Sequence, residues 1–333
     1  MTLSQFEHRQ DEAEVAIRVS ICIPTHNGAR WLKETLRSAL TQTYESLEIL
    51  VVDDASTDRT LEVVRSFRDA RIRVEVNERN LGMVRNWNRC VKLSKGSLVK
   101  FLFQDDLLYP TCVEKMTRIF EENQRVGIVF APRDTLLENP DDAVAVAWKN
   151  RCGTLHTRFK SLRRVNRGGA LFEQWLSDGF RENWVGEPSS VMLRKTCLEQ
   201  VGMFNTRMHQ TVDLEMWIRM MYFYDVGFID EPLSAFRFHS ASATMTLTSR
   251  ITNTLWLERM WLLEGLLRQK GIRENYPQIK RLRLQEAGQV ILGQIVRIWR
   301  HYPMQVLYMT WSLGDYLKHF LLALVHRAPS IHE

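Results

Sequence analysis

Three short polar segments in the first third of the chain carry residue types that could do chemistry. They are Pro24-Thr-His-Asn27, Asp53-Asp54 and Gln104-Asp105-Asp106, and each follows a short apolar run. Two adjacent carboxylates at a strand end repel each other unless a cation offsets their charge. Mg²⁺ and Mn²⁺ prefer oxygen ligands of this kind and bridge readily to phosphates. The pattern therefore indicates a site for a phosphate-bearing ligand with a divalent cation.

The same carboxylates also have structural interpretations. Asp105 or Asp106 could cap the helix expected over residues 110–121. In the same way, Asp53 or Asp54 could cap the turn at Ser56–Asp58. A cap explains one carboxylate of a pair but not both. The chain has neither a G-x-G-x-x-G segment after its first expected strand nor a P-loop. Any bound nucleotide would therefore hold its phosphates through metal and side chains rather than a glycine-rich loop.

Alternating hydrophobic periodicities predict the elements that position these segments. Short apolar runs predict strands over residues 19–24, 47–52, 71–76 and 97–103, and i, i+3/i+4 stripes predict helices over 30–40, 59–67 and 82–93. Strands that alternate with helices through short connections predict a mostly parallel sheet. Ligands bind at the carboxyl ends of such strands. We therefore expect the three polar segments to meet at one edge of the sheet.

Composition narrows the class of protein. With 333 residues, 45% hydrophobic and 25% charged, the chain resembles an ordinary folded protein, which excludes disordered and collagen-like classes. Five scattered cysteines without a CxxC pair favour a reducing compartment. The first residues lack the apolar core of a signal peptide, and no run of 18 apolar residues occurs. These features predict a cytoplasmic protein.

The positive charge gathers at the C-terminal end. Residues 250–333 hold 12 Lys and Arg against 6 Asp and Glu, an excess equal to the whole formal charge of +6. The rest of the chain is neutral, so nucleic acid is not an expected partner. Helical stripes cover residues 251–325, with breaks near residues 271–277 and at Pro303. This tail fits a helical cap on the catalytic body and a helix pair in a membrane interface equally well.

The middle of the chain is less regular. Periodicity weakens over residues 131–181, which is typical of a lid, a substrate loop or an exposed insertion. It returns with a strand expected over 189–193, a helix over 212–223 and a strand over 226–229.

Seven motifs, in this order and spacing, resemble the family 2 glycosyltransferases. They are Val19–Asn27, Ile49–Asp58, Asn80–Asn86, Phe103–Asp106, Val201–Phe204, Asp213–Trp217 and Phe236–Thr244. The resemblance covers residues 18–245. It implies an α/β GT-A fold, a mostly parallel central sheet flanked by helices, and transfer of a sugar from a nucleotide diphosphate with inversion. The expected division is an N-terminal tail (1–17), a catalytic domain (18–249) with a nucleotide-sugar half (18–130) and an acceptor half (131–249), and a basic helical extension (250–333).

The resemblance also implies roles for residues at the nucleoside end. Pro24, Thr25 and Asn27 would line the nucleoside pocket. Asp54 would accept a hydrogen bond from the base, and Arg85 would lie near the base or the phosphates.

Further roles concern the phosphates and the metal. Asp105 would lie near the ribose or donor sugar, and Asp106 would coordinate the metal and the nucleotide. His239 matches a histidine that contacts metal or phosphate. Gln104 stands where the family often has a carboxylate, which leaves Asp106 as the main expected protein ligand for Mn²⁺ or Mg²⁺.

Asp213 matches the catalytic base of the family. It would take the proton of the acceptor hydroxyl while that oxygen attacks the anomeric carbon. A simple N-cap of the helix that follows is the structural alternative, and Glu215 and Glu187 are the neighbouring carboxylates.

The predicted function is a metal-dependent inverting glycosyltransferase. Its donor is a nucleotide sugar, with UDP as the default nucleotide. Its acceptor is a glycan or a lipid-linked oligosaccharide in surface polysaccharide synthesis. The C-terminal extension would then make peripheral contact at the inner face of the membrane. A non-catalytic nucleotide-sugar-binding scaffold of the same fold is the alternative, and a nucleotidyltransferase is a third.

Overall fold

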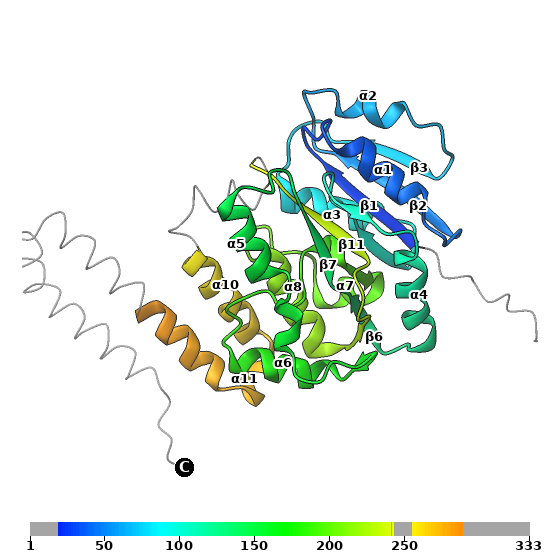
Figure 1. The fold of residues 1–333 in the computed structure, drawn as a ribbon. Coiled ribbons are helices and arrows are strands. Elements are labelled where there is room, and N and C mark those ends of the chain that lie inside the picture. Colours follow the sequence, from blue (N-terminus) through cyan, green and yellow to red (C-terminus); the bar gives the residue numbers. More distant parts are fainter. Residues whose placement is uncertain (1–18, 241, 243–254, 289–333) are drawn as a thin grey trace, which may run out of the picture. The chain divides into compact units, whose positions relative to one another are not determined.

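The strands and helices predicted for the first part of the chain are present, with ends shifted by at most two residues (Figure 1). The computed structural model describes residues 19–240, 242 and 255–288. The strands are β1 (Val19–Thr25), β2 (Leu47–Asp53), β3 (Ile72–Val76), β4 (Leu98–Phe101), β5 (Leu107–Leu108), β6 (Val126–Phe130), β7 (Arg133–Leu137), β8 (Val165–Asn166), β9 (Val191–Arg194), β10 (Asp225–Phe228) and β11 (Ser234–Phe238). The helices are α1 (Leu32–Leu40), α2 (Thr60–Arg65), α3 (Met83–Leu93), α4 (Cys112–Glu122), α5 (Ala143–Cys152), α6 (Gly168–Ser177), α7 (Lys195–Val201), α8 (Val212–Phe223), α10 (Leu255–Arg268) and α11 (Lys270–Asn275), with short 3₁₀ turns η1 (Leu155–Arg158) and η2 (Pro188–Ser190).

Two sheets organise the catalytic part of the chain. The larger has the strand order β3-β2-β1-β4-β9-β6-β10-β8, and the smaller has the order β5-β11-β7. Strands β3, β2, β1 and β4 are parallel, and β9 lies antiparallel between β4 and β6. Strand β9 therefore joins the first half of the sheet to the second, and the fold is GT-A-like with a mainly parallel central sheet, as predicted.

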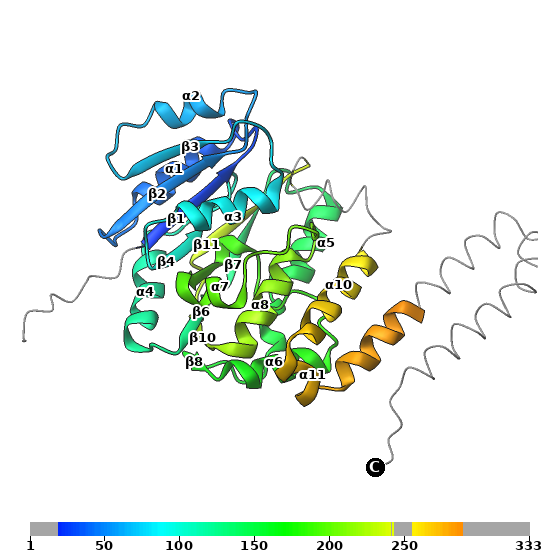
Figure 2. The same cartoon turned by 180° about the vertical axis from the view of Figure 1, so that it is seen from behind.

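Helices cover both faces of the first half of the sheet. Helix α3 packs on β1 and β2 on one face, while α1 and α2 lie together on the other face (Figures 1 and 2). The opposite placement follows from the crossovers, because α1 and α2 lead outward from β1 to β3 whereas α3 leads back across to β4. The apolar sides of β1, β2, α1 and α4 form the main core.

The segment expected to be an irregular loop, residues 131–181, contains regular structure. It holds β7, α5, β8 and α6. Helix α5 escaped prediction because Ala145 is its one buried residue, so it has no apolar stripe. Its start is nevertheless encoded locally, since the Asp142 side chain accepts hydrogen bonds from the backbone N–H groups of Val144 and Ala145. The segment is therefore more regular than its weak periodicity indicated, and its role as a lid, a substrate loop or an insertion stays a prediction.

The chain divides into two compact units, Met1–Glu258 and Arg259–Glu333. The boundary expected between residues 249 and 250 falls among residues outside the described part. In the second unit a helix break falls at Tyr276, close to the predicted one. The break predicted at Pro303 and the stripe over 306–324 also lie outside the described residues. None of the helices that the structure describes combines the length and apolar character that a bilayer crossing needs.

Candidate active site

The carboxyl ends of β1 and β2 meet as predicted. Thr25 and Asp53 are register partners in the parallel pair, and the Thr25 hydroxyl donates to Asp53 Oδ2 over 3.0 Å. Asp53 also accepts from the backbone N–H of Ser56 at 2.9 Å and from its hydroxyl at 2.5 Å. Asp53 is therefore the member of its pair that caps the turn, which confirms the structural interpretation for that residue.

Asp54 holds a second turn and faces the ligand side. Its carboxylate accepts from the Asn77 side chain at 2.7 Å and from the backbone N–H groups of Leu81 and Gly82 at 2.8 and 2.9 Å. Gly82 has a φ of +86°, a conformation that favours glycine. The Asn80–Asn86 motif is thus attached to the end of β2 through Asp54, and the expected contact of Asp54 with a base stays a prediction.

The loop after β1 is fixed by side chains from two other segments. Asn27 accepts from the Thr57 backbone N–H at 2.8 Å, and the Gln104 amide bonds the backbone N–H and carbonyl of His26 at 2.9 and 3.3 Å. At Gly28 a Cβ atom would lie 2.3 Å from Gln104 Oε1, so a larger residue there would displace the Gln104 side chain. Gln104, which departs from the family pattern, fastens this loop.

Arg85 lies away from the other predicted donor residues. Helix α3 buries Val84, Asn86 and Trp87, and at 100° per residue Arg85 falls on the opposite face, where it is exposed. The lining of the cavity described below includes Asn86 and Trp87 but not Arg85. The structure therefore does not bring Arg85 to the site.

Asp105 and Asp106 have different environments. Asp105 Oδ2 contacts His239 Nε2 at 2.9 Å, and both residues line the cavity. Asp106 is fully buried and does not line it. Asp106 Oδ1 accepts from the backbone N–H of Arg237 at 2.9 Å, whose guanidinium Nε donates to the Asp105 carbonyl. Asp106 therefore fixes β11, and so His239, against the end of β4.

Electrostatics separate the two aspartates further. Burial and, after it, the charge of Asp105 raise the pKa of Asp106 well above its usual range. Asp106 Oδ2 lacks a well-aligned hydrogen bond within the described structure, although the Ser189 hydroxyl is close enough to help hold the carboxylate charged. The carboxylate that lines the cavity is Asp105, whereas the sequence favoured Asp106 as the ligand of the metal. The difference arises because Asp106 points into the interior between β4 and β11.

The donor set suits a metal that is shared with substrate. The described residues hold no group of three or more His, Cys, Asp or Glu side chains arranged around one metal position. Asp105 and His239 are adjacent at the cavity, and His239 Nδ1 is buried without a hydrogen-bond partner in the described part. Mg²⁺ commonly binds through one or two carboxylates together with substrate phosphates and waters. These residues therefore fit a cation that arrives with a diphosphate.

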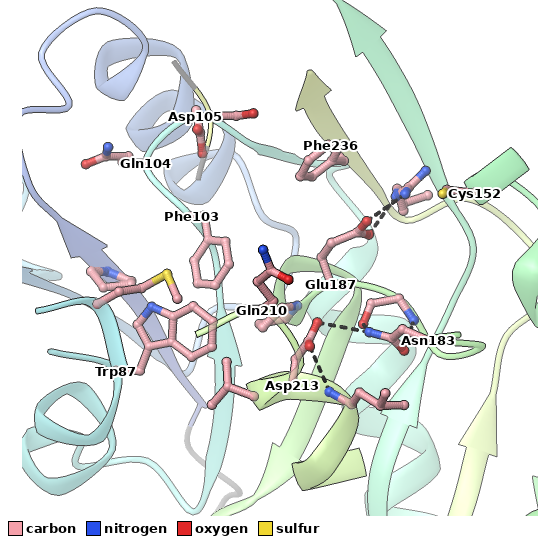
Figure 3. A pocket seen from close by; sticks show the side chains of 18 of the residues that line it. Trp87, Phe103, Gln104, Asp105, Cys152, Asn183, Glu187, Gln210, Asp213 and Phe236 are labelled. Carbon is pink, nitrogen blue, oxygen red and sulfur yellow. Dashed lines mark hydrogen bonds and ion pairs between the residues drawn. The ribbon is translucent and has the colours of Figure 1, made fainter. Parts of the chain in front are cut away.

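Asp213 lies in the first turn of α8, as predicted. Its carboxylate accepts from the Asn183 side chain at 2.9 Å and from the Leu214 backbone N–H at 2.7 Å (Figure 3). Burial, with a smaller contribution from the charge of Glu187, raises the pKa of Asp213 to about 7. A carboxylate with a pKa near neutral is suited to take a proton from a hydroxyl group. The N-cap residue of α8 is Thr211, so Asp213 is not the simple N-cap that the structural alternative required, and its side chain lines the cavity.

A buried ion pair stands beside Asp213. Glu187 receives two hydrogen bonds from the Arg133 guanidinium at 2.8 and 2.7 Å, and the side chain of Arg133 is only 7% exposed. Burial opposes the charge of Glu187, but Arg133 outweighs it and lowers the pKa of that carboxyl. The Arg133 guanidinium also lies over the rings of Trp148 on α5 and Phe236 on β11. Sequence reasoning noted Glu187 but missed Arg133, because no local signal joins residues 54 positions apart.

Glu215 has a structural role. It is buried and pairs with Arg219 one helical turn later, at 2.7 and 2.8 Å. Arg219 in turn donates to the carbonyls of Val201, Gly202 and Met203. The pair thus fixes the Val201–Phe204 motif on α8 and leaves Asp213 as the carboxylate of this helix that faces the cavity.

One cavity of about 960 Å³ joins these groups. The predicted residues on its wall are Pro24, Thr25, Asn27, Asp54, Asp105, Asp213 and His239. Aromatic side chains, among them Trp87, Phe103 and Phe236, form much of the rest (Figure 3). The volume is at the upper end of the range for small-ligand sites. We call Asp54, Asp105 and His239 the donor end of this cavity and Asp213 and Glu187 its acceptor end, after the predicted roles of Asp54, Asp105 and Asp213.

Comparisons with known proteins agree with this architecture. The family model described as "Glycosyl transferase family 2" matches residues 20–176. The chain is 35% identical to the uncharacterized protein MT1568 of Mycobacterium tuberculosis (strain CDC 1551 / Oshkosh), over 77% of this chain and 78% of that protein.

Solved structures show the same fold. TarS of S. aureus (residues 1–349), in complex with UDP-GlcNAc, has a TM-score of 0.56 at 17% identity, over 75% of this chain and 67% of that one. The mannosyltransferase PcManGT of Pyrobaculum calidifontis, in complex with GDP-Man and Mn²⁺, has a TM-score of 0.51 at 18% identity, over 94% and 81%.

Fold and site together define a glycosyltransferase of the GT-A type. The chain belongs to glycosyltransferase family 2.

Proposed function

We propose that the protein transfers a sugar, with inversion, from a nucleoside diphosphate sugar to a hydroxyl group of a glycan or lipid-linked acceptor. The observation that carries this proposal is the placement of Asp213, with a pKa of about 7, in the same cavity as Asp105 and His239. A base at one end and a phosphate-binding set at the other suit displacement across an anomeric carbon. UDP is the donor nucleotide proposed first, and GDP and dTDP are the alternatives.

The acceptor end would perform the proton transfer. Asp213 takes the proton from the acceptor hydroxyl as that oxygen forms a bond to the anomeric carbon. The bond between this carbon and the diphosphate oxygen breaks, and the nucleoside diphosphate leaves with the electron pair. Asn183 holds the carboxylate in place through its hydrogen bond to Oδ2.

The donor end would bind the nucleotide and stabilise its leaving. Pro24, Thr25, Asn27 and Asp54 line the nucleoside side of the cavity, and Asp105 and His239 face the diphosphate. A Mn²⁺ or Mg²⁺ ion bound there would supply positive charge for the phosphate oxygens. The mannosyltransferase neighbour was solved with both GDP-Man and Mn²⁺, which supports this part of the proposal.

Calorimetric titration with UDP, GDP and dTDP, each with and without Mn²⁺, tests the donor assignment. We expect micromolar binding of one nucleotide, dependent on the metal and weakened by Asp105→Asn. Absence of binding for all three would refute the donor assignment. A transfer assay then separates an enzyme from a nucleotide-sugar-binding scaffold, because the scaffold would bind the nucleotide sugar without turnover.

The final part of the proposal concerns surface polysaccharide synthesis at the inner face of the membrane. It rests on the basic composition of residues 250–333. Sedimentation with anionic lipid vesicles checks it, using the full chain and a chain that ends at residue 302. Equal sedimentation of the two would contradict membrane contact through residues 303–333.

A further inference from the structure

The carboxylate of Glu258 is enclosed by backbone N–H groups of one short loop. It accepts hydrogen bonds from the N–H groups of His209 at 2.9 Å, Gln210 at 2.9 and 3.2 Å and Thr211 at 2.8 Å, and from the Thr211 hydroxyl at 3.0 Å. Glu258 is only 2% exposed. A carboxylate that accepts several N–H groups away from water makes a strong, directional attachment. The loop His209–Thr211 is therefore fixed by Glu258. This residue lies beyond residues 20–176, which the family model matches, and beyond the last motif, which ends at residue 244.

This loop leads directly into the catalytic helix. Thr211 is the N-cap residue of α8 but makes no side-chain cap of its own. Asp213 follows two residues later, in the first turn of α8. The position of the loop therefore sets the position of the Asp213 side chain. Without Glu258, three neighbouring N–H groups would lose their partner, and unpaired buried N–H groups cost free energy.

The loop also presents Gln210 to the cavity. Gln210 lines the cavity together with Asp213 and Glu187, and in Figure 3 its amide lies between Phe103 and Glu187 in projection. Gln210 Oε1 is buried and has no hydrogen-bond partner among the described residues. Trp184, also on the cavity wall, has a buried indole N–H that is likewise unpartnered in the described part.

Unpartnered groups of this kind specify a ligand. A buried polar atom without a partner is costly, and binding a complementary group removes that cost. The unpartnered Gln210 Oε1 needs a hydrogen-bond donor, which a sugar hydroxyl supplies and an ionised phosphate, with acceptors only, does not. The Arg133 guanidinium is already paired with Glu187.

We propose that Gln210 binds a hydroxyl group of one of the two sugars in the reaction, and that Glu258 is the positioning residue that holds Gln210 at the cavity. This inference rests on the proposed glycosyl transfer and adds the residue that selects the sugar. The sugar is that of the donor or that of the acceptor, and the experiment distinguishes the two.

The first experiment compares Gln210→Met with the wild type. Methionine keeps the length and volume of the side chain and removes its hydrogen bonds. Calorimetry measures affinity for UDP, UDP-GlcNAc, GDP and GDP-mannose, and kinetics measure transfer to acceptor and hydrolysis of the nucleotide sugar. We expect affinity for the free nucleotides to stay within about twofold, because Gln210 lies at the acceptor end.

Each outcome decides the proposal. If Gln210 binds the donor sugar, the variant loses about tenfold or more in affinity for the nucleotide sugar relative to its nucleotide. If it binds the acceptor sugar, nucleotide-sugar affinity and hydrolysis are unchanged and kcat/KM for the acceptor falls by about tenfold or more. Unchanged values in every assay would overturn the role of Gln210. A wild-type protein that binds no nucleotide would instead refute the proposed function itself.

The second experiment tests the positioning residue. Glu258→Gln is compared with Glu264→Gln, a matched change further along α10 at an exposed ion pair with Arg268. We expect the Glu258 variant to reproduce the sugar-specific loss of Gln210→Met while free-nucleotide affinity is retained, and Glu258→Asp to restore part of the loss. The double variant Glu258→Gln/Gln210→Met should lose no more sugar-dependent affinity than Gln210→Met alone.

Melting temperatures of all variants show whether each folds. The role of Glu258 would be overturned if the Glu258→Gln protein melts like the Glu264→Gln protein and also keeps wild-type affinity for the nucleotide sugar and wild-type kcat/KM for the acceptor. If Glu258→Gln fails to fold, Glu258→Asp provides the same comparison. Losses that simply add in the double variant would also overturn it.

Discussion

The two ends of the cavity are built in different ways. At the donor end, Asp53, Asp54 and Asp106 are held largely by backbone N–H groups and short side chains close to the strand ends. At the acceptor end, Glu187 is held by the single guanidinium of Arg133. The donor end therefore depends on contacts close to the strand ends, whereas Glu187 at the acceptor end depends on one long side chain from β7, 54 positions away in the chain.

A second contrast lies within the acceptor end, between the pKa shifts of its two acidic groups. Asp213 and Glu187 are neighbours, yet burial raises the pKa of Asp213 whereas Arg133 lowers that of Glu187. Two carboxyl groups with opposite shifts can take different roles in one site. The acceptor end thus separates a proton acceptor from a permanently charged group by means of one arginine.

The largest expected effect is at the base. Asp213→Asn should lower kcat by about 10²–10⁴-fold, because a positioned general base contributes that much. Affinity for the nucleoside diphosphate should stay unchanged, since the donor end is intact. Steady-state kinetics and calorimetry measure the two quantities, and a comparable loss of nucleotide affinity would contradict the division of the cavity into two ends.

The next effect concerns the stability of the acceptor end. Arg133→Met leaves Glu187 buried without its partner and should lower the free energy of unfolding by about 3–5 kcal/mol. Adding Glu187→Met should recover most of this loss, because no uncompensated charge then remains. Urea denaturation of the two variants provides the measurement. If the double variant is as unstable as Arg133→Met alone, the unpaired charge of Glu187 is not the cause of the lost stability.

At the donor end, a smaller and metal-specific effect is expected. Asp105→Asn should weaken nucleotide binding in the presence of Mn²⁺ by about 10–100-fold and leave metal-free binding unchanged. Asp106→Asn serves as the comparison, since it should alter the melting temperature more than the metal dependence. A metal effect at Asp106 alone would restore the assignment made from the sequence.

The pH dependence follows from Asp213. Its pKa rises from 3.8 to about 7 on folding, so the folded state binds more protons over this range and stability falls as the pH rises through it. Asp213→Asn lacks this loss, so from pH 5 to pH 8 the variant should gain on the order of 2 kcal/mol relative to wild type. The wild-type kcat should rise with pH to a plateau above about 7. Parallel pH profiles of stability would contradict the raised pKa.

The smallest effect is expected at Arg85. Because its side chain lies on the exposed face of α3, Arg85→Ala should change affinity for the nucleoside diphosphate by less than about twofold. Calorimetry in low salt checks this. A tenfold loss would show that Arg85 reaches the donor after all, as the family resemblance implied.

The donor end could be predicted because its determinants are local. The apolar runs of β1, β2 and β4 end directly before Pro24, Asp53 and Gln104, and parallel strands bring their carboxyl ends together. The pattern could not tell which aspartate of each pair faces the ligand. That choice depends on the donors around each carboxylate, such as Ser56 for Asp53 and the Arg237 backbone for Asp106.

The sequence alone determined the fold class, the family, the strand-end position of the donor residues and Asp213 as the candidate base. These features rest on periodicity and on short motifs, both of which are read within about ten residues. Only the tertiary structure decided that Asp105 rather than Asp106 meets the cavity, that Arg133 neutralises Glu187, and that Glu258 holds the loop before α8. Those contacts join residues far apart in the chain, and their side chains meet only after the sheets and helices have packed.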